Sequence, residues 1–182
     1  MGTHVTFYPL ERAHFPHLLK WLNAPHVHLV WGGHERWTAA HVAEKYGSYV
    51  DGYAFDGVEK RPMFAYVFAI DGKPAGFIQC YDAYDFARAG YELEDVLDTR
   101  RYSSLAGLDF YLGESTLLGK GWGSHVLHDF LIHFVWKKFR ACFVDPDPAN
   151  AVGIKAFAGA GFMELDAPED IQIVPMLAIS TL

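Results

Sequence analysis

Residues 117–124 read Leu-Leu-Gly-Lys-Gly-Trp-Gly-Ser, and this glycine-rich stretch is the most informative part of the sequence. Three glycines alternate with other residues between an apolar, strand-like run, Leu108 to Leu112, and a long helical pattern that begins at Trp122. The first N–H groups of a helix have no intrahelical partner and carry partial positive charge. Glycines at such a place let an anion approach the backbone closely, so the stretch predicts a cradle for a pyrophosphate group.

Two common nucleotide-binding motifs do not match this stretch. A dinucleotide-binding fingerprint needs a full β-α-β unit and an acidic residue about 20 residues further on. A Walker loop needs a Lys-Ser or Lys-Thr pair after its last glycine, whereas Gly123 is followed by Ser124 and His125. From the spacing alone, a turn or a helix cap without any ligand also stays open.

The composition favours a compact globular protein. The chain has 182 residues, of which 51% are hydrophobic and 16% aromatic, so we expect one domain over residues 1–182. The net charge of −7 argues against nucleic acid or an anionic membrane as a partner and favours a cationic one. Cys80 and Cys142 lie in apolar, strand-like runs, which predicts buried thiols. Without a long apolar span or an opening signal peptide, we expect a cytoplasmic protein.

Hydrophobic periodicity and turn residues predict a mixed α+β fold. The expected elements, in order, are a strand at 4–8, a helix at 15–22, a helix capped by Thr38 and running to Val50, strands at 63–70 and 75–81 joined by Asp71-Gly72, a long loop at 82–104, a strand at 107–112, a helix at 122–139, a strand at 141–144, a helix after Asn150, and strands at 162–165 and 171–179. No internal repeat or linker divides this order.

A second motif lies downstream of the glycine stretch. Residues 150–157 read Asn-Ala-Val-Gly-Ile-Lys-Ala-Phe and lead to Ala160-Gly161-Phe162. Together with the glycine stretch, this motif resembles the GNAT superfamily of acyl-CoA-dependent N-acyltransferases. The resemblance covers essentially the whole chain and implies a mixed, mostly antiparallel central sheet flanked by helices.

The resemblance also implies acetyl-CoA as acyl donor and a set of residues that contact it. In the family the glycine loop binds the CoA pyrophosphate, and the helix that starts at the Asn contacts the pantetheine arm. The implied cofactor-binding residues are Leu112, Leu117, Leu118, Gly119, Lys120, Gly121, Trp122, Gly123, Ser124, Asn150 and Phe157. Leu118 departs from the family's usual Arg or Gln, and Phe157 departs from its usual Tyr.

Acyl transfer to an amine needs a proton acceptor, because an alkylamine with a pKa near ~10.4 is mostly ammonium at pH 7. Asp109 is the candidate, since it lies inside the apolar run that precedes the glycine stretch. The period of two places Gly107, Asp109 and Tyr111 on one strand face. A carboxylate on the wet face of an antiparallel strand is the alternative. Glu114 is a second candidate base.

Four motifs look like those of the aminoglycoside 6′-N-acetyltransferases. They are Trp31-Gly32-Gly33, Gly107-Leu108-Asp109, Leu118-Gly119-Lys120-Gly121-Trp122-Gly123 and Asp145-Pro146-Asp147-Pro148-Ala149-Asn150. The similarity implies that Trp31 lines the substrate site, that Asp109 approaches the 6′-amine, and that Asp145 contacts the antibiotic. It also implies direct transfer in a ternary complex.

The loop at 82–104 alternates acidic and aromatic residues, a composition that suits ammonium groups on a sugar scaffold. Asp82, Asp85 and Glu92 are therefore further candidate substrate contacts, and the expected partner is a small polycationic amine. A solvated surface loop is the alternative. Arg88, Arg100 and Arg101 would neutralise part of the loop's charge internally.

Other functions remain open at this point. Pro25-His26-Val27 before a tryptophan and the Asp-Pro-x-x-x-Asn segment at 145–150 also look like the siderophore-biosynthesis lysine N-acyltransferases. Those enzymes commonly place a catalytic His in the middle strands, whereas no histidine lies between His41 and His125 here. A catalytically silent CoA-binding or interaction module is a third interpretation, motivated by Phe157. His125, Asp129 and His133 share a helix face, but acyl transfer needs no metal and we expect none. We expect a monomer or a homodimer.

Overall fold

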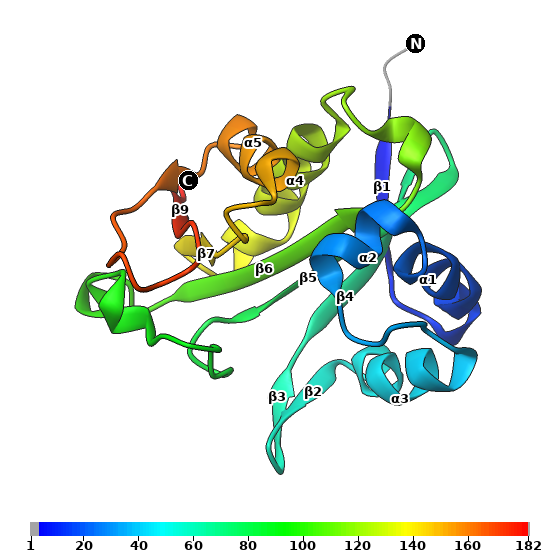
Figure 1. Cartoon of the computed structure of the whole chain (residues 1–182), viewed down its shortest axis with the longest axis horizontal. Coiled ribbons are helices and arrows are strands. Elements are labelled where there is room, and N and C mark those ends of the chain that lie inside the picture. The colour runs from blue at the N-terminus through cyan, green and yellow to red at the C-terminus, as the bar shows by residue number, and fades with distance from the viewer. Residues whose placement is uncertain (1–3, 182) are drawn as a thin grey trace. The chain divides into compact units, whose positions relative to one another are not determined.

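The computed structural model describes residues 4–181 (Figure 1). Its contacts group the chain into two compact units. The first comprises the chain up to Cys80 together with Asp109–Lys120, and the second comprises Tyr81–Leu108 together with the chain from Gly121 onward. Each unit is therefore built from separated stretches of sequence. The single domain over 1–182 stays a prediction, and residues 1–3 and 182 lie outside the described part.

The strands of the first unit follow the order β1 (Val5–Pro9), β4 (Phe64–Ile70), β5 (Lys73–Asp82) and β6 (Leu105–Leu112), with β6 shared between the two units. The β1–β4 and β4–β5 pairs are antiparallel. The predicted hairpin between β4 and β5 is confirmed. Its turn residues Asp71 and Gly72 have φ values of 49° and 78°, the left-handed pair that a two-residue hairpin turn requires.

Three helices and a short hairpin complete the first unit. They are α1 (Phe15–Leu22), α2 (Pro25–Trp31), α3 (Ala39–Val50) and the β2–β3 hairpin (Tyr53–Asp56 and Glu59–Pro62). The cap of α3 is confirmed, because Thr38 Oγ1 accepts a hydrogen bond from the His41 N–H at 3.2 Å. Leu18, Trp21 and Tyr46 are fully buried in one hydrophobic cluster with the β5 residue Phe77.

The helix α2 and the β2–β3 hairpin are absent from the sequence prediction. α2 has only seven residues and each strand of the hairpin has four. Both elements are therefore too short for their hydrophobic periodicity to be recognised in the sequence. The signals that were present are Pro25 at the first position of α2 and Gly57 in the hairpin turn.

The strands of the second unit follow the order β6, β7 (Ala141–Val144), β9 (Met176–Ile179) and β8 (Met163–Glu164). The β6–β7 pair is parallel, whereas the β7–β9 and β8–β9 pairs are antiparallel. The prediction of a mixed, mostly antiparallel sheet in an α+β fold is thus confirmed, and the sheet has seven strands. A parallel pair needs a crossover connection, which α4 (Trp122–His133) supplies between β6 and β7.

Three predicted boundaries in the second unit are wrong. The helix expected at 122–139 ends at His133, and residues 135–137 form a separate 3₁₀ turn. The strand expected at 162–165 is limited to β8, and the strand expected at 171–179 begins at Met176. Proline restricts this region, because Pro168 and Pro175 have no N–H to donate to a ladder.

Two expectations about chemistry can be checked against the fold. Cys80 and Cys142 are both buried, as predicted. Between residues 4 and 181, no helix is both long enough and apolar enough to cross a membrane.

Candidate active site

Asp109 is half-buried on β6 and is held by a neighbouring strand. Gln79 of β5 is only 7% exposed, and its side-chain amide donates a hydrogen bond to Asp109 Oδ2 at 2.9 Å. Two residues along each strand, Phe77 and Tyr111 stack with ring centroids 5.7 Å apart. These two contacts confirm that Asp109 and Tyr111 share one face of β6. The amide fixes the orientation of the carboxylate.

Two titratable residues of helix α3, Lys45 and Tyr49, interact electrostatically with the Asp109 carboxylate. Burial lowers the pKa of Lys45, and the negative charge of Asp109 acts in the opposite direction. Burial also raises the pKa of Tyr49, with Asp109 adding to the increase. Both effects require Asp109 to lie within electrostatic range of α3. The carboxylate is therefore bound by the Gln79 amide and lies within electrostatic range of Lys45 and Tyr49.

Trp31 reaches this face from the C-terminal end of α2. Its indole N–H donates to the Tyr46 hydroxyl at 3.2 Å, and its ring meets Tyr111 edge-on with centroids 4.8 Å apart. Gly32 ends the helix with a φ of 62°, a conformation that favours glycine. Within the first unit, Trp31 thus contacts Tyr111, which lies on the same face of β6 as Asp109.

The end of β6 is fixed by a residue that the sequence does not single out as a site residue. His26 of α2 lies with Nε2 2.9 Å from the Leu112 carbonyl oxygen, and the next N–H, that of Gly113, donates to the Ala75 carbonyl at 2.7 Å. A Cβ on Gly113 would lie 2.3 Å from the Trp21 ring, so only glycine fits there. The only sequence signal for His26 is the Pro25-His26-Val27 segment.

Glu114, the second candidate base, is engaged in structural contacts. Its Oε1 accepts hydrogen bonds from Lys20 Nζ at 2.6 Å and from the Trp21 indole N–H at 2.9 Å. The hydrogen bonds from these two donors hold the pKa of Glu114 below its usual value. Because the Trp21 side chain is fully buried, this carboxylate satisfies a donor that water cannot reach.

Replacing Glu114 should destabilise the fold. We expect Glu114→Ala to lower the free energy of unfolding by about 1–3 kcal/mol at pH 7, because the buried indole N–H loses its acceptor. Glu114→Gln should cost less, since an amide oxygen still accepts. The lowered folded-state pKa means that the stabilisation is present above the unfolded pKa and is lost as pH falls through the folded pKa. The difference between wild type and Glu114→Gln should therefore shrink in acid.

Urea unfolding at pH 7 and at acidic pH checks this expectation. Glu44→Ala is the matched control, because Glu44 is an exposed glutamate on α3. An equal loss of stability in Glu114→Ala and Glu44→Ala would contradict the structural role of Glu114.

The glycine stretch forms an open turn that leads into α4. Gly119 and Gly121 have φ values of 69° and 80°, and a Cβ on either would meet no atom of the described residues within 4 Å. Gly121 is the N-cap of α4, and its carbonyl accepts the first intrahelical bond, from the His125 N–H at 3.2 Å. The N–H groups of Trp122, Gly123 and Ser124 precede that bond, so they form the donor-rich end of the helix.

Among the described residues, the start of α4 has neither a side-chain cap nor an acidic residue in its first turn. Two other helices, α3 and α5 (Ala151–Gly159), do have a side-chain cap. Thr38 caps α3, and Asn150 caps α5 by accepting a hydrogen bond from the Gly153 N–H at 3.0 Å. An uncapped N-terminus behind two glycines fits a bound anion, because free N–H groups and the helix dipole both favour negative charge there.

The remaining predicted cofactor residues of the second unit also make packing contacts between α4 and α5. The Ser124 hydroxyl donates to the Ala156 carbonyl at 3.0 Å, and a Cβ on Gly159 would meet that hydroxyl at 2.3 Å. Phe157 is 6% exposed and meets Phe162 edge-on, with centroids 5.3 Å apart. Their contribution to cofactor binding stays a prediction.

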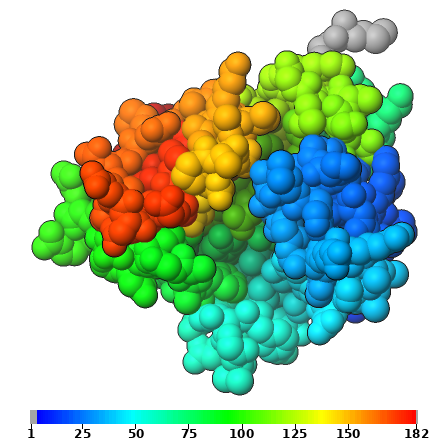
Figure 2. Space-filling view, viewed as in Figure 1, coloured from blue at the N-terminus to red at the C-terminus, as the bar shows by residue number. Residues whose placement is uncertain are grey.

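The loop at 82–104 is a packed structure rather than a freely solvated one. Its Tyr91, Leu93, Val96 and Leu97 are buried in a cluster with β7 and β9. In Figure 2 the green residues of this loop lie against the orange and red residues that follow β8, several of which pack on the same cluster. The predicted contacts Asp82 and Glu92 serve local structure, Asp82 in a turn with the Tyr84 N–H and Glu92 in the cap of a 3₁₀ turn at 93–95.

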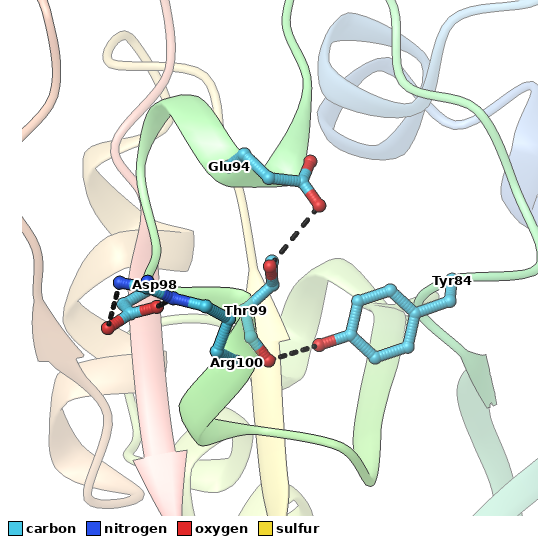
Figure 3. A network of polar contacts seen from close by, with 5 residues as sticks. All are labelled: Tyr84, Glu94, Asp98, Thr99 and Arg100. Atoms are coloured by element: carbon cyan, nitrogen blue, oxygen red, sulfur yellow. Dashed lines mark hydrogen bonds and ion pairs between the residues drawn. The ribbon is translucent and has the colours of Figure 1, made fainter.

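Hydrogen bonds and an ion pair tie the outer part of this loop together (Figure 3). The Tyr84 hydroxyl donates to the Thr99 carbonyl at 3.4 Å, and the Thr99 hydroxyl donates to Glu94 at 3.2 Å. Arg100 donates two hydrogen bonds to the Asp98 carboxylate, from Nε to Oδ1 at 2.8 Å and from Nη2 to Oδ2 at 3.3 Å. Arg100 neutralises a carboxylate of the loop, as expected from the sequence, whereas Arg88 pairs with Asp145, which lies outside the loop.

Asp145, the predicted antibiotic contact at the end of β7, is paired inside the second unit. Its Oδ2 accepts hydrogen bonds from Arg88 Nη1 at 2.9 Å and from the Tyr91 hydroxyl. Burial acts to lower the pKa of Arg88, but the negative charge of Asp145 prevails and the pKa is raised. Asp145 is therefore paired with a permanent cation.

The described residues contain no group of three or more His, Cys, Asp or Glu side chains arranged to hold a metal ion. On α4, His125 Nε2 lies 3.6 Å from Asp129 Oδ2, a contact that suits an ion pair when the imidazole is protonated.

Solved structures with this fold include several aminoglycoside acetyltransferases. The chain is 26% identical to the aminoglycoside acetyltransferase AAC(6')-Ib in complex with coenzyme A, with a TM-score of 0.76 over 97% of this chain and 95% of that one. The same protein in complex with paromomycin and acetyl-CoA matches at 26% identity and a TM-score of 0.76, over 96% of this chain and 93% of the other.

An aminoglycoside N(6')acetyltransferase from Legionella pneumophila shares the fold at 15% identity, with a TM-score of 0.65 over 98% of this chain and 94% of that chain. Curated protein sequences give no match. The family model described as an acetyltransferase (GNAT) domain matches residues 11–168, which is most of the chain. The chain therefore belongs to the GNAT acetyltransferase family.

Proposed function

We propose that this GNAT acetyltransferase uses acetyl-CoA to acetylate a primary amine of an aminoglycoside-like aminosugar by direct transfer in a ternary complex. The observation that carries the proposal is Asp109, a carboxylate oriented by the Gln79 amide on the β6 face that Trp31 also contacts through Tyr111. The solved relatives that bind coenzyme A and aminoglycosides support the same substrate class.

Asp109 is the proposed proton acceptor. Acetyl-CoA supplies an activated thioester, so the main task of the protein is to present a neutral amine. The Asp109 carboxylate accepts a proton from the bound ammonium group, directly or through water, while the Gln79 amide holds its Oδ2 in place. The amine nitrogen then attacks the thioester carbonyl carbon, the C–S bond breaks, the nitrogen gives up its second proton to water as the amide forms, and the released thiolate takes a proton from solvent.

The start of α4 is the proposed site for the CoA pyrophosphate. Gly119 and Gly121 leave open space where side chains would stand, and the first N–H groups of α4 have no side-chain cap within the described chain. Backbone donors supply most of such a contact. The departure at Leu118 therefore does not weaken the proposal.

Phe157 provides a test of how the thiolate is protonated. We expect measurable wild-type activity and a gain in turnover of at most about tenfold for Phe157→Tyr, because general-acid help to a good leaving group is small. Steady-state turnover of the two proteins, each checked by thermal melting, gives the answer. A gain of several thousandfold would mean that the wild type is a degenerate enzyme and would favour the catalytically silent interpretation.

Product analysis tests the proposed function. The protein is incubated with acetyl-CoA and kanamycin, and the position of the acetyl group is located by NMR spectroscopy. We expect a single acetyl group on a primary amine. The absence of acetylation on kanamycin and on every other aminosugar tried would refute the proposed substrate class but not membership of the GNAT family.

A further inference from the structure

Arg88 forms an ion pair with Asp145, the carboxylate that the sequence motifs assign to substrate binding. The Asp145 side chain is 27% exposed, so a ligand could reach it, yet its Oδ2 already accepts from both Arg88 and Tyr91. An ammonium group that approaches this carboxylate therefore meets a neutral ion pair rather than a free negative charge.

Arg88 is fixed in this position by more than its ion pair. Its side chain is only 10% exposed, and its guanidinium lies 4.8 Å from the ring centroid of Phe143, within cation–π distance. Within residues 4–181 its Nε and Nη2 are buried and have no hydrogen-bond partner. A buried guanidinium with two unsatisfied donors depends strongly on its one carboxylate, so giving that carboxylate to a ligand is costly.

Arg100 shows the contrast within the same loop. It pairs with Asp98, but its side chain is 88% exposed and that of Asp98 is 42% exposed. Water can replace either partner there at little cost. The two pairs therefore differ in whether the carboxylate can be released to a ligand.

We propose that Arg88 is a specificity-determining residue that withholds Asp145 from substrate ammonium groups. Acceptors that carry the reacting amine and few other positive charges are then preferred over heavily charged aminosugars. This inference rests on the proposed function, because it names the class of aminosugar that the same enzyme accepts.

Arg88→Met tests the inference, because methionine fills the buried volume without charge or donors. Kanamycin has several ammonium groups, and 6-amino-6-deoxyglucose has one. We expect Arg88→Met to bind kanamycin about tenfold more tightly in calorimetry, with a steeper loss of affinity as salt rises, and to change the KM for 6-amino-6-deoxyglucose by less than about twofold. Arg100→Met is the matched control and should leave both values within about twofold.

A folded Arg88→Met protein with unchanged or weaker kanamycin affinity would overturn the inference, and so would an equal gain for both sugars. The double variant Arg88→Met/Asp145→Asn gives an independent answer if Arg88→Met fails to fold, because it removes both charges of the pair and leaves no buried charge unpaired. It should bind kanamycin within about threefold of the wild type, because the pair it replaces is already neutral. A loss beyond about thirtyfold would show that Asp145 binds an ammonium group despite Arg88.

The binding experiment separates this inference from the proposed function. Calorimetry compares wild type and variant without any turnover. Failure of the wild type to acetylate any aminosugar refutes the proposed function, whereas the affinity ratio between Arg88→Met and wild type bears on Arg88 alone.

Discussion

Asp109→Asn should lower turnover by about 10²–10⁴-fold while leaving the affinity for CoA nearly unchanged. The amide keeps the size and shape of the side chain and can still contact Gln79, but it cannot accept a proton from the substrate ammonium group. Because the lost interaction acts on proton transfer, the effect should appear in kcat. Thiol release in the steady state measures turnover, and calorimetry measures CoA binding.

Asp98→Asn is the matched control for this change. Asp98 is an exposed aspartate paired with the exposed Arg100, so its loss should alter turnover little. If Asp109→Asn kept near-full turnover on a true substrate, Asp109 would not be the base. Glu114 is committed to Lys20 and Trp21, so a carboxylate of the loop at 82–104 would then be the first alternative to examine.

Gly121→Glu should weaken CoA binding by roughly 10- to 100-fold. The new carboxylate would stand in open space at the start of α4, where it repels a pyrophosphate and offers its own negative charge to the helix N-terminus. A side chain at a φ of 80° also strains the turn. Calorimetry of CoA against wild type and variant measures the loss.

Gly57→Glu is the matched control for the added charge and the backbone strain. Gly57 lies in the turn of the β2–β3 hairpin with a φ of 59°, and a Cβ there would meet no described atom within 4 Å. We expect this variant to bind CoA as the wild type does. Unchanged CoA affinity in Gly121→Glu would refute the assignment of the glycine stretch to the pyrophosphate.

The parts of the fold that the sequence predicts well are those specified by local chemistry. Helix α1 matches its predicted range, Thr38 caps α3 as expected, and Asp71-Gly72 forms the expected hairpin turn. The end of α4 depends instead on tertiary packing. Phe134 leaves the helical conformation while its ring stacks on Phe130 with centroids 5.0 Å apart, a contact that a periodic pattern cannot reveal.

The candidate site divides in the same way. Motifs along the sequence identify Trp31, Asp109 and the glycine stretch, but the partners of these residues come from distant parts of the chain. Gln79 precedes Asp109 by 30 residues, and Arg88 precedes Asp145 by 57. Pairing of this kind is set by the strand order and by loop packing, so a single sequence carries no direct signal for it.

A coupled thiol-release assay with a panel of amines tests whether the protein acetylates aminosugars. Wild-type protein and acetyl-CoA are assayed with kanamycin, 6-amino-6-deoxyglucose, a polyamine, N-hydroxylysine and a peptide with a free N-terminus. We expect amine-dependent thiol release with the aminosugars and little with the other acceptors. Release with N-hydroxylysine or the peptide, and none with any aminosugar, would contradict this expectation.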